Sequence, residues 1–192
     1  MVIVLQPAEE VGNGAPAILA SGALDDVKAI FGAHVDRRFA VGQVVAQAGP
    51  LAASADSFSI EVLGKGAHGA RPHEGIDPIV AAAAIVGALQ TIVSRRLDPG
   101  AVAVVTVGSI HGGSAPNVIP ERVTLTGTLR AMHPAVRAAL HHHVTSMATD
   151  VAATHGATVN VVIEQGPPPI VNPERESGWA RTAAERVLGA EN

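Results

Sequence analysis

Two adjacent glutamates near the start of the chain, Glu9 and Glu10, and a later histidine, His34, are the residues best suited to chemistry. A hydrolytic metal site needs anionic oxygen and imidazole ligands, and it also needs a carboxylate that activates water without being used as a ligand. Adjacent glutamates can divide these two tasks. A glutamate pair alone more often lies on a solvated surface, and a lone histidine more often fills the end of a strand. The position of these residues in the fold therefore has to decide between a chemical and a structural role.

Two apolar runs would place these residues at strand ends. Val2 to Leu5 precedes the glutamate pair, and residues 29–33 end on His34. Neither run alternates with polar residues, a pattern typical of inner strands of a parallel α/β sheet. Residues 15–24 lie between them, with a proline near the start and a glycine near the end, and predict a crossover helix. Because such sheets gather reactive groups at the carboxyl ends of their strands, we expect Glu10 and His34 to approach each other.

Composition excludes several classes of protein. The 192 residues, 47% of them hydrophobic, suffice for one large or two small domains. A formal net charge of -4 and only 2% aromatic residues argue against nucleic-acid binding. No apolar run approaches the length of a membrane span, no charged leader precedes the first apolar run, and there is no cysteine. We therefore expect a cytoplasmic protein with neither a nucleic-acid nor a membrane partner.

The middle of the chain has a different pattern, in which strands alternate with helices. Helices are predicted from Asp77 to Arg96 and from Pro134 to Gly156, because each has a proline at its start and a charge or glycine suited to its end. Four strands are predicted from alternating or continuous apolar residues: 58–62, 102–107, 123–130 and 159–163. The order β-α-β-β-α-β predicts a ferredoxin-like domain, with an antiparallel sheet and both helices on one face.

The predicted organisation is therefore α/β with an insertion. Residues 1–52 are interpreted as part of a catalytic α/β domain, residues 53–166 as an inserted ferredoxin-like lid, and residues 167–192 as the start of the return to the first domain. Gly166 and the three prolines after it predict a stiff exit from the lid. Because the chain begins on a strand expected to be buried and ends just after a helical pattern, we interpret it as an internal fragment.

Four motifs occur along the chain in a specific order: Gln6-Pro7-Ala8-Glu9-Glu10, Gly32-Ala33-His34, Gly64-Lys65-Gly66-Ala67-His68-Gly69-Ala70-Arg71-Pro72-His73 and Gly112-Gly113-Ser114-Ala115-Pro116-Asn117-Val118-Ile119-Pro120. Together they resemble the metal-dependent amidohydrolases of the aminoacylase and carboxypeptidase clan. The greatest similarity is to the branch of hippurate hydrolases, N-acyl-amino-acid amidohydrolases and auxin-conjugate amidohydrolases. The resemblance extends from the first strand to about residue 171.

This resemblance implies a divalent metal site. It makes Glu9 the general base and Glu10 and His34 metal ligands, with one or two ions in the intact enzyme. Carboxylate and imidazole ligands suit Zn, Mn, Co or Ni, so the metal stays open. Members of the clan carry further ligands upstream and downstream that this sequence does not contain. The stretch from Arg37 to Ala40 also differs from the proline-containing segment usual after the ligand histidine.

The resemblance also assigns functions to the inserted domain. It implies a lid that forms a homodimer, in which His68 reaches the active site of the partner subunit and stabilises the oxyanion. Asn117 and Arg130 are implied to bind the substrate carboxylate, and an amide and a guanidinium suit that task chemically. The alternatives are that His68 lies in a wet Gly-Pro loop and that Arg130 is a surface charge at a strand end.

The remaining histidines have no assigned role. His73 and His111 lie in glycine-containing segments. The run from His141 to His143 resembles a metal-binding tract, but three consecutive residues cannot share one face of a helix, so we expect the run to be mostly solvated.

These observations predict hydrolysis of the amide bond of an N-acyl amino acid or a related small amide. The alternatives are a non-catalytic dimerisation or binding module and a dipeptidase of the same clan. Because part of the ligand set of the clan is missing from the sequence, we expect the 192-residue chain on its own to be inactive.

Overall fold

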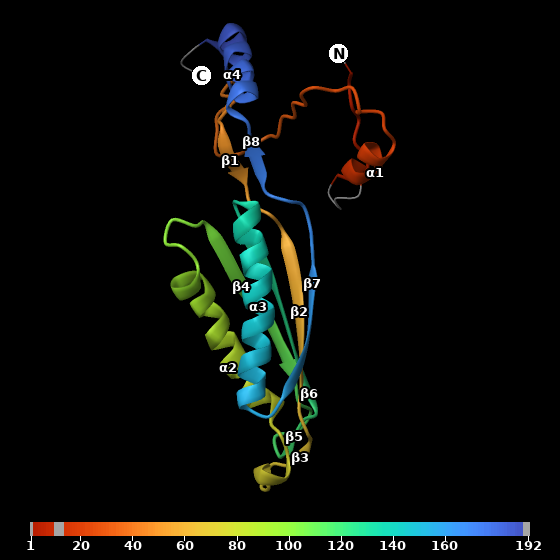
Figure 1. Cartoon of the computed structure of the whole chain (residues 1–192), viewed down its shortest axis with the longest axis vertical. Coiled ribbons are helices and arrows are strands. Elements are labelled where there is room, and N and C mark those ends of the chain that lie inside the picture. Colours follow the sequence, from red (N-terminus) through yellow and green to blue (C-terminus); the bar gives the residue numbers. More distant parts are fainter. Residues whose placement is uncertain (1, 10–13, 190–192) are drawn as a thin grey trace. The chain divides into compact units, whose positions relative to one another are not determined.

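The computed structural model describes residues 2–9 and 14–189 (Figure 1). The chain divides into two compact units. Unit 1 consists of the residues up to 51 together with those from 171 onward. Unit 2 consists of residues 52–170.

Unit 2 is built on a four-stranded antiparallel sheet with strand order β4-β6-β2-β7. Figure 1 shows α2 and α3 lying together on one face of this sheet. Its main elements are β2 (Asp56–Leu63), α2 (Pro78–Thr91), β4 (Ala103–Gly112), β6 (Arg122–Ala131), α3 (Pro134–Thr154) and β7 (Thr158–Glu164). The predicted β-α-β-β-α-β order and ferredoxin-like architecture are confirmed.

Smaller elements complete the two units. In unit 2 a short two-stranded ladder and a single 3-10 turn follow β2, and a π turn extends α2: β3 (Ala67–His68), β5 (Val118–Ile119), η1 (Pro72–Glu74) and η2 (Ile92–Arg96). Two helices belong to unit 1, and a further strand pair joins its two chain segments: α1 (Gly14–Ala20), α4 (Glu174–Leu188), β1 (Gly49–Ala52) and β8 (Ile170–Asn172).

The core of unit 2 lies between the sheet and the two helices. Strand β2 alternates strictly, so that Phe58, Ile60 and Val62 are buried while the intervening Ser59 and Glu61 lie on the opposite face. The helices contribute small and aliphatic side chains that are fully buried: Ala81, Ala82, Ile85, Leu89, Leu140, Val144, Ala148 and Ala152. Burial of this apolar surface is the main force that holds the helices on the sheet.

The ends of both helices are set by local sequence. Asp77 caps α2, because its Oδ1 accepts hydrogen bonds from the backbone N–H groups of Ile79 at 2.8 Å and Val80 at 3.4 Å. Helix α3 ends at Thr154, and Gly156 then adopts a φ of 71°, a left-handed conformation that favours glycine. Both boundaries agree with the sequence prediction.

Residues Pro78–Arg96 form one helix of 19 residues that is long and apolar enough to cross a membrane by length and composition alone. The sequence expectation that no segment approaches that length was therefore too strong. The inner face of this helix packs on the sheet, with Ile85, Leu89 and Ile92 fully buried. Such packing is typical of a helix in the core of a folded domain.

Unit 1 differs from the sequence prediction. The predicted helix is present but ends at Ala20. The two predicted strands, Val2–Leu5 and residues 29–33, are not strands in the structure, and the first run is between 40% and 88% exposed. A strand needs a neighbour to take up its N–H and C=O groups, and no described segment pairs with either run.

The C-terminal part of unit 1 is held by side chains from α4 and the segment before it. The hydroxyl of Ser177 donates to the carbonyl oxygens of Gln47 and Pro173, at 3.2 and 2.7 Å. The amide of Asn172 and the guanidinium of Arg181 bind carbonyls in the same segment before β1. These bonds anchor that segment along the start of α4.

Candidate functional site

Glu9 is exposed and follows a strained turn in unit 1. The residue before it, Ala8, has a φ of 51°, which side chains other than glycine rarely adopt and which occurs preferentially at functional sites. Gly14 packs against the same turn, because a Cβ at Gly14 would overlap the carbonyl oxygen of Pro7. Glu10, the predicted metal ligand, lies outside the described residues.

The ring of His34 is oriented by a bond to the backbone. Its Nδ1 lies 2.6 Å from the carbonyl oxygen of Val35. A carbonyl oxygen can only accept, so Nδ1 carries the proton in this contact, and in the neutral ring the free lone pair is then on Nε2. A histidine whose other nitrogen donates to a carbonyl is the usual arrangement of a metal ligand.

His68 has the opposite arrangement. It lies exposed on β3, and its Nδ1 accepts a hydrogen bond from the backbone N–H of Ala70 at 3.1 Å. With Nδ1 acting as the acceptor, the proton of the neutral ring is on Nε2. His68 therefore presents a hydrogen-bond donor to its surroundings, which is what stabilisation of an oxyanion requires.

The structure brings His68 and Asn117 together. In the β3–β5 ladder His68 pairs with Val118, and the N–H of Gly69 donates to the carbonyl oxygen of Asn117 at 2.7 Å. A Cβ on Gly69 would lie only 3.0 to 3.3 Å from backbone atoms of Asn117. Likewise, a Cβ on Gly75 would lie 2.8 Å from the Cβ of Ala67. The glycines of this loop thus permit backbones to approach closely and fix the spacing of the two candidate residues.

Arg130 does not join them within one chain. Asn117 lies just before β6 begins at Arg122, whereas Arg130 lies at the other end of that strand. The eight residue steps from Arg122 to Arg130 correspond to about 26 Å. A small carboxylate cannot span that distance, so Asn117 and Arg130 of the same copy cannot bind it together.

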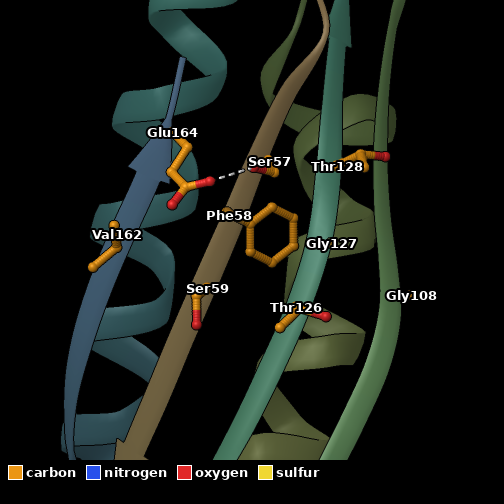
Figure 2. Close-up of a pocket in the computed structure, with 9 residues that line it drawn as sticks. All are labelled: Ser57, Phe58, Ser59, Gly108, Thr126, Gly127, Thr128, Val162 and Glu164. Atoms are coloured by element: carbon orange, nitrogen blue, oxygen red, sulfur yellow. Dashed lines mark hydrogen bonds between the residues drawn. The ribbon is translucent and has the colours of Figure 1, made fainter. Parts of the chain in front are cut away.

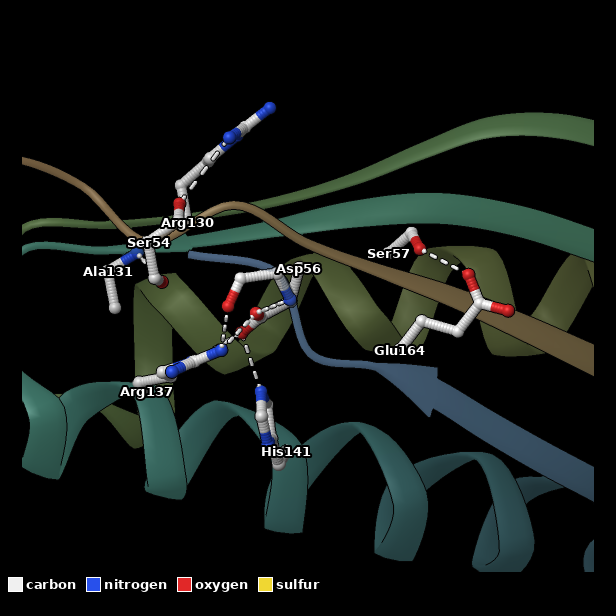
Figure 3. A network of polar contacts seen from close by, with 9 residues as sticks. Ser54, Asp56, Ser57, Arg130, Ala131, Arg137, His141 and Glu164 are labelled. Atoms are coloured by element: carbon white, nitrogen blue, oxygen red, sulfur yellow. Dashed lines mark hydrogen bonds and ion pairs between the residues drawn. The ribbon is translucent and has the colours of Figure 1, made fainter. Parts of the chain in front are cut away.

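Asp56 forms a polar cluster that the sequence analysis missed. Its buried carboxylate accepts two hydrogen bonds from Arg137, at 2.6 and 2.8 Å, and pairs with Nε2 of His141 at 2.7 Å (Figure 3). The N–H of Gly166 adds a further bond at 3.0 Å. Burial raises the pKa of Asp56, but these bonds outweigh it and hold that pKa below its ordinary value.

The predicted solvation of the histidine run is therefore wrong for His141, whose side chain is only 19% exposed. Although three consecutive residues cannot share a face, one of them can turn inward. The available signal was the spacing of four between Arg137 and His141 on α3, together with the position of Asp56 on the buried side of β2.

Of the other histidines named above without an assigned role, three lie at the surface, and His143 on α3 is half-buried. His73 is exposed in the turn η1, His111 is exposed on β4 opposite Thr124, and His142 is exposed on α3. Across residues 2–9 and 14–189, no group of three or more histidine, cysteine, aspartate or glutamate side chains is placed to hold a metal ion.

A hollow of about 380 Å³ lies on the face of the sheet opposite the helices (Figure 2). It forms where Gly127 and Gly108 lack side chains, with the ring of Phe58 at its floor. Gly127 has to be glycine, because a Cβ there would overlap that ring and the carbonyl oxygen of Thr106. The hollow contains none of the predicted site residues. It results from the glycines on β4 and β6 rather than from a binding site.

Comparison with known proteins agrees with these features. Residues 53–156 match the family described as a peptidase dimerisation domain. The N-acetyl-L-cysteine deacetylase of Bacillus subtilis (strain 168) is 42% identical over 96% of this chain and 44% of its own length. The IAA-amino acid hydrolase ILR1-like 4 of Arabidopsis thaliana is 41% identical over 100% of this chain and 44% of its own length. Among solved structures, the Bacillus subtilis YXEP protein, described as a dinuclear metal-binding peptidase from the M20 family, is 34% identical with a TM-score of 0.78, over 95% of this chain and 46% of that one.

The chain spans less than half the length of these relatives. The matched dimerisation domain nevertheless covers more than half of the chain and lies within unit 2, the ferredoxin-like part of the chain. The resemblance identified from the four motifs is thereby confirmed. The chain belongs to the M20 family, as a partial chain that carries its peptidase dimerisation domain.

Proposed function

We propose that this chain is part of a metal-dependent amidohydrolase that cleaves the amide bond of an N-acyl amino acid or a related small amide. The observation that carries the proposal is the opposite arrangement of two histidines: His34 keeps a free lone pair on Nε2, whereas His68 presents an N–H there. One suits a metal ligand and the other suits an oxyanion donor. Relatives whose names describe deacetylation of N-acetyl-L-cysteine and hydrolysis of IAA-amino acids support the substrate class.

In this proposal Glu9 takes a proton from the attacking water and passes it to the leaving amine. Glu10 and His34 would hold one or two divalent ions, Zn, Mn, Co or Ni, whose contribution when bound is to polarise the carbonyl and to lower the pKa of water. His68 donates from Nε2 to the developing oxyanion. The substrate carboxylate is bound by the amide of Asn117 and the guanidinium of Arg130.

We further propose that two copies of the chain complete each site. His68 and Asn117 lie at one end of unit 2 and Arg130 at the other, so a single small substrate can meet all three only if one end comes from a partner. A homodimer is the simplest symmetric solution. The matched dimerisation domain supports the same conclusion.

The surface most suited to this dimer is formed by the edge strand β4 and the neighbouring helix α2. An edge strand leaves N–H and C=O groups free to pair with another chain. A groove of about 390 Å³, lined by residues of both elements, runs along this edge. Exposed aliphatic side chains gather on the two elements and the turns that follow or precede them: Ile79, Val80, Val93, Val102, Val104 and Ile110.

Mixed dimers test the proposal. In the longest in-frame protein that contains this chain, Glu9→Gln and His68→Ala should each abolish most hydrolysis of N-acetyl amino acids. After the two variants are unfolded and refolded together, about a quarter of wild-type activity should return, because half of the dimers then contain one intact site. His68→Ala mixed with itself is the control and should stay inactive. Absence of recovery from a mixture shown to contain mixed dimers would contradict a shared site.

A further inference from the structure

The Asp56 cluster lies where the chain enters and leaves unit 2. Asp56 begins β2, and Gly166 follows β7 by two residues. The carboxylate of Asp56 accepts from the N–H of Gly166, while Arg137 donates to the carbonyl oxygen of Gly166 at 2.9 Å. One buried carboxylate and one guanidinium thus tie the entering segment, the leaving segment and α3 together.

The entering and leaving segments also contact each other directly. The N–H of Ala55 donates to the carbonyl oxygen of Pro167 at 3.1 Å. Gly166 lies so close to Ala55 that a Cβ on the glycine would overlap the carbonyl oxygen of Ala55. Gly166, which is hydrogen-bonded to both Asp56 and Arg137, is therefore in direct contact with the residue just before β2.

Ser54 connects this cluster to the end of β6. It is fully buried, its N–H donates to the carbonyl oxygen of Ala131 at 2.8 Å, and its Oγ accepts from the N–H of Ala131 at 3.2 Å. The carbonyl oxygen of Ser54 accepts a hydrogen bond from the guanidinium of Arg130 at 3.5 Å. Figure 3 shows Arg130 on the opposite side of the strands from Arg137 and His141.

We propose that Asp56 is a positioning residue for Arg130: through Ser54 it fixes the guanidinium that the proposed function assigns to the substrate carboxylate. The catalytic consequence of this inference rests on the proposed function. The linkage from Asp56 to Arg130 is independent of that function. Buried ion pairs add little net stability over apolar side chains of similar volume, whereas they hold their partners in one geometry. A fixed geometry is what a carboxylate-binding arginine needs.

The experiment compares the same substitution at two serines of one segment. Ser54→Ala removes the acceptor of the buried Ala131 N–H, and Ser57→Ala is the matched control on the exposed face. In the 192-residue chain, amide exchange at Ala131 should accelerate about tenfold in Ser54→Ala. The heteronuclear NOE of the Arg130 Nε–H group should fall as well, and Asp56→Asn should reproduce both changes. Ser57→Ala should produce neither.

The catalytic arm uses the longest in-frame protein that contains the chain. Ser54→Ala should raise KM for an N-acetyl amino acid about fivefold with kcat nearly unchanged, because a uniform binding interaction is weakened. Arg130→Ala in the same assay separates the proposed binding of the carboxylate by Arg130 from the proposed linkage between Asp56 and Arg130. If Arg130→Ala leaves KM unchanged, the carboxylate role fails, and the linkage is then decided by exchange and NOE alone.

Three results would overturn the inference. The first is an Arg130 NOE that stays at its wild-type value in Ser54→Ala while Ala131 exchanges faster. The second is an equal response to Ser57→Ala. The third is an unchanged KM in Ser54→Ala when Arg130→Ala raises it. If Asp56→Asn does not fold, Ser54→Ala alone decides between these outcomes.

Discussion

The cost of removing the buried charge of Asp56 can be worked out from its surroundings. Asp56→Asn keeps the shape of the side chain but leaves the guanidinium of Arg137, which is only 15% exposed, without its anionic partner. Breaking a buried, hydrogen-bonded ion pair in this way costs about 3–5 kcal/mol. Domains of this size are stable by about 5–15 kcal/mol, so the variant should fold but with much of its margin lost.

The measurement is urea unfolding of the 192-residue chain, followed by far-UV circular dichroism. The matched control is Glu61→Gln on the same strand, whose partner Arg122 lies at 3.1 Å but is 69% exposed. An exposed pair of this kind contributes less than about 1 kcal/mol. The double variant Asp56→Asn, Arg137→Met should recover part of the loss, because no buried charge is then left unpaired.

The same cluster sets a pH dependence with a definite sign. The pKa of Asp56 is lower in the folded chain than its ordinary value, so ionisation stabilises the folded state. That stability is fully present above the ordinary aspartate pKa of about 3.9, and it is lost as the pH falls below this value toward the folded pKa. In Asp56→Asn the loss in this acid window should be smaller. An equal loss of unfolding free energy in Asp56→Asn and Glu61→Gln at neutral pH would refute the argument that the buried Asp56 pair is the more costly one to break.

Three further predictions concern the proposed site. In the longest in-frame protein, Glu9→Gln should lower turnover by about a hundred- to ten-thousand-fold while the metal content stays nearly unchanged. Glu10→Gln should mainly lower the metal content. Equal metal loss in both variants would contradict the assignment of Glu9 as the base and Glu10 as a ligand. Ile110→Arg, on the edge strand β4, should shift the chain from dimer to monomer in sedimentation, whereas Val162→Arg on the opposite edge strand should not. The 192-residue chain alone should show no hydrolysis of N-acyl amino acids with any added divalent metal, because Glu10 and His34 provide about half of the ligands of a tetrahedral site; metal-stimulated turnover by the purified chain would contradict this.

The fold of unit 2 could be predicted because its signals are local. The alternation of β2 follows from the two-residue period of a strand whose partners are all within unit 2. The start of α2 follows from Asp77 and the proline after it, whose effects extend over a single turn. Each of these elements finds its neighbours within residues 52–170, so the local pattern and the tertiary structure agree.

The prediction of strands just before Glu9 and His34 was wrong for the complementary reason. An unbroken apolar run indicates a strand only if other strands and helices cover it, and Val2–Leu5 pairs with no described segment. The Asp56 cluster was missed because Asp56 is separated from its partners by about 80 to 110 positions and meets them only when the sheet and α3 have packed. The roles of the site residues likewise depend on atoms that the sequence does not place, such as the carbonyl oxygen of Val35 beside His34.

The length of β6 explains why the candidate site residues of unit 2 lie in two separate places, at opposite ends of that strand. The strand has ten residues and carries Arg130 near its end, while the loop that leads into its start holds Asn117 beside His68. Neither end is free to move toward the other, because β6 lies between β4 and β2, pairing with β2 from Arg122 to Leu129 and with β4 from Val123 to Ala131. A closure that brought the two ends together would have to break the core formed by Leu125 and Leu129, which are almost fully buried. The sheet therefore acts as a rigid spacer of about 26 Å, so the proposed function, in which Asn117 and Arg130 bind one small carboxylate substrate, requires a second copy placed with its opposite end adjacent.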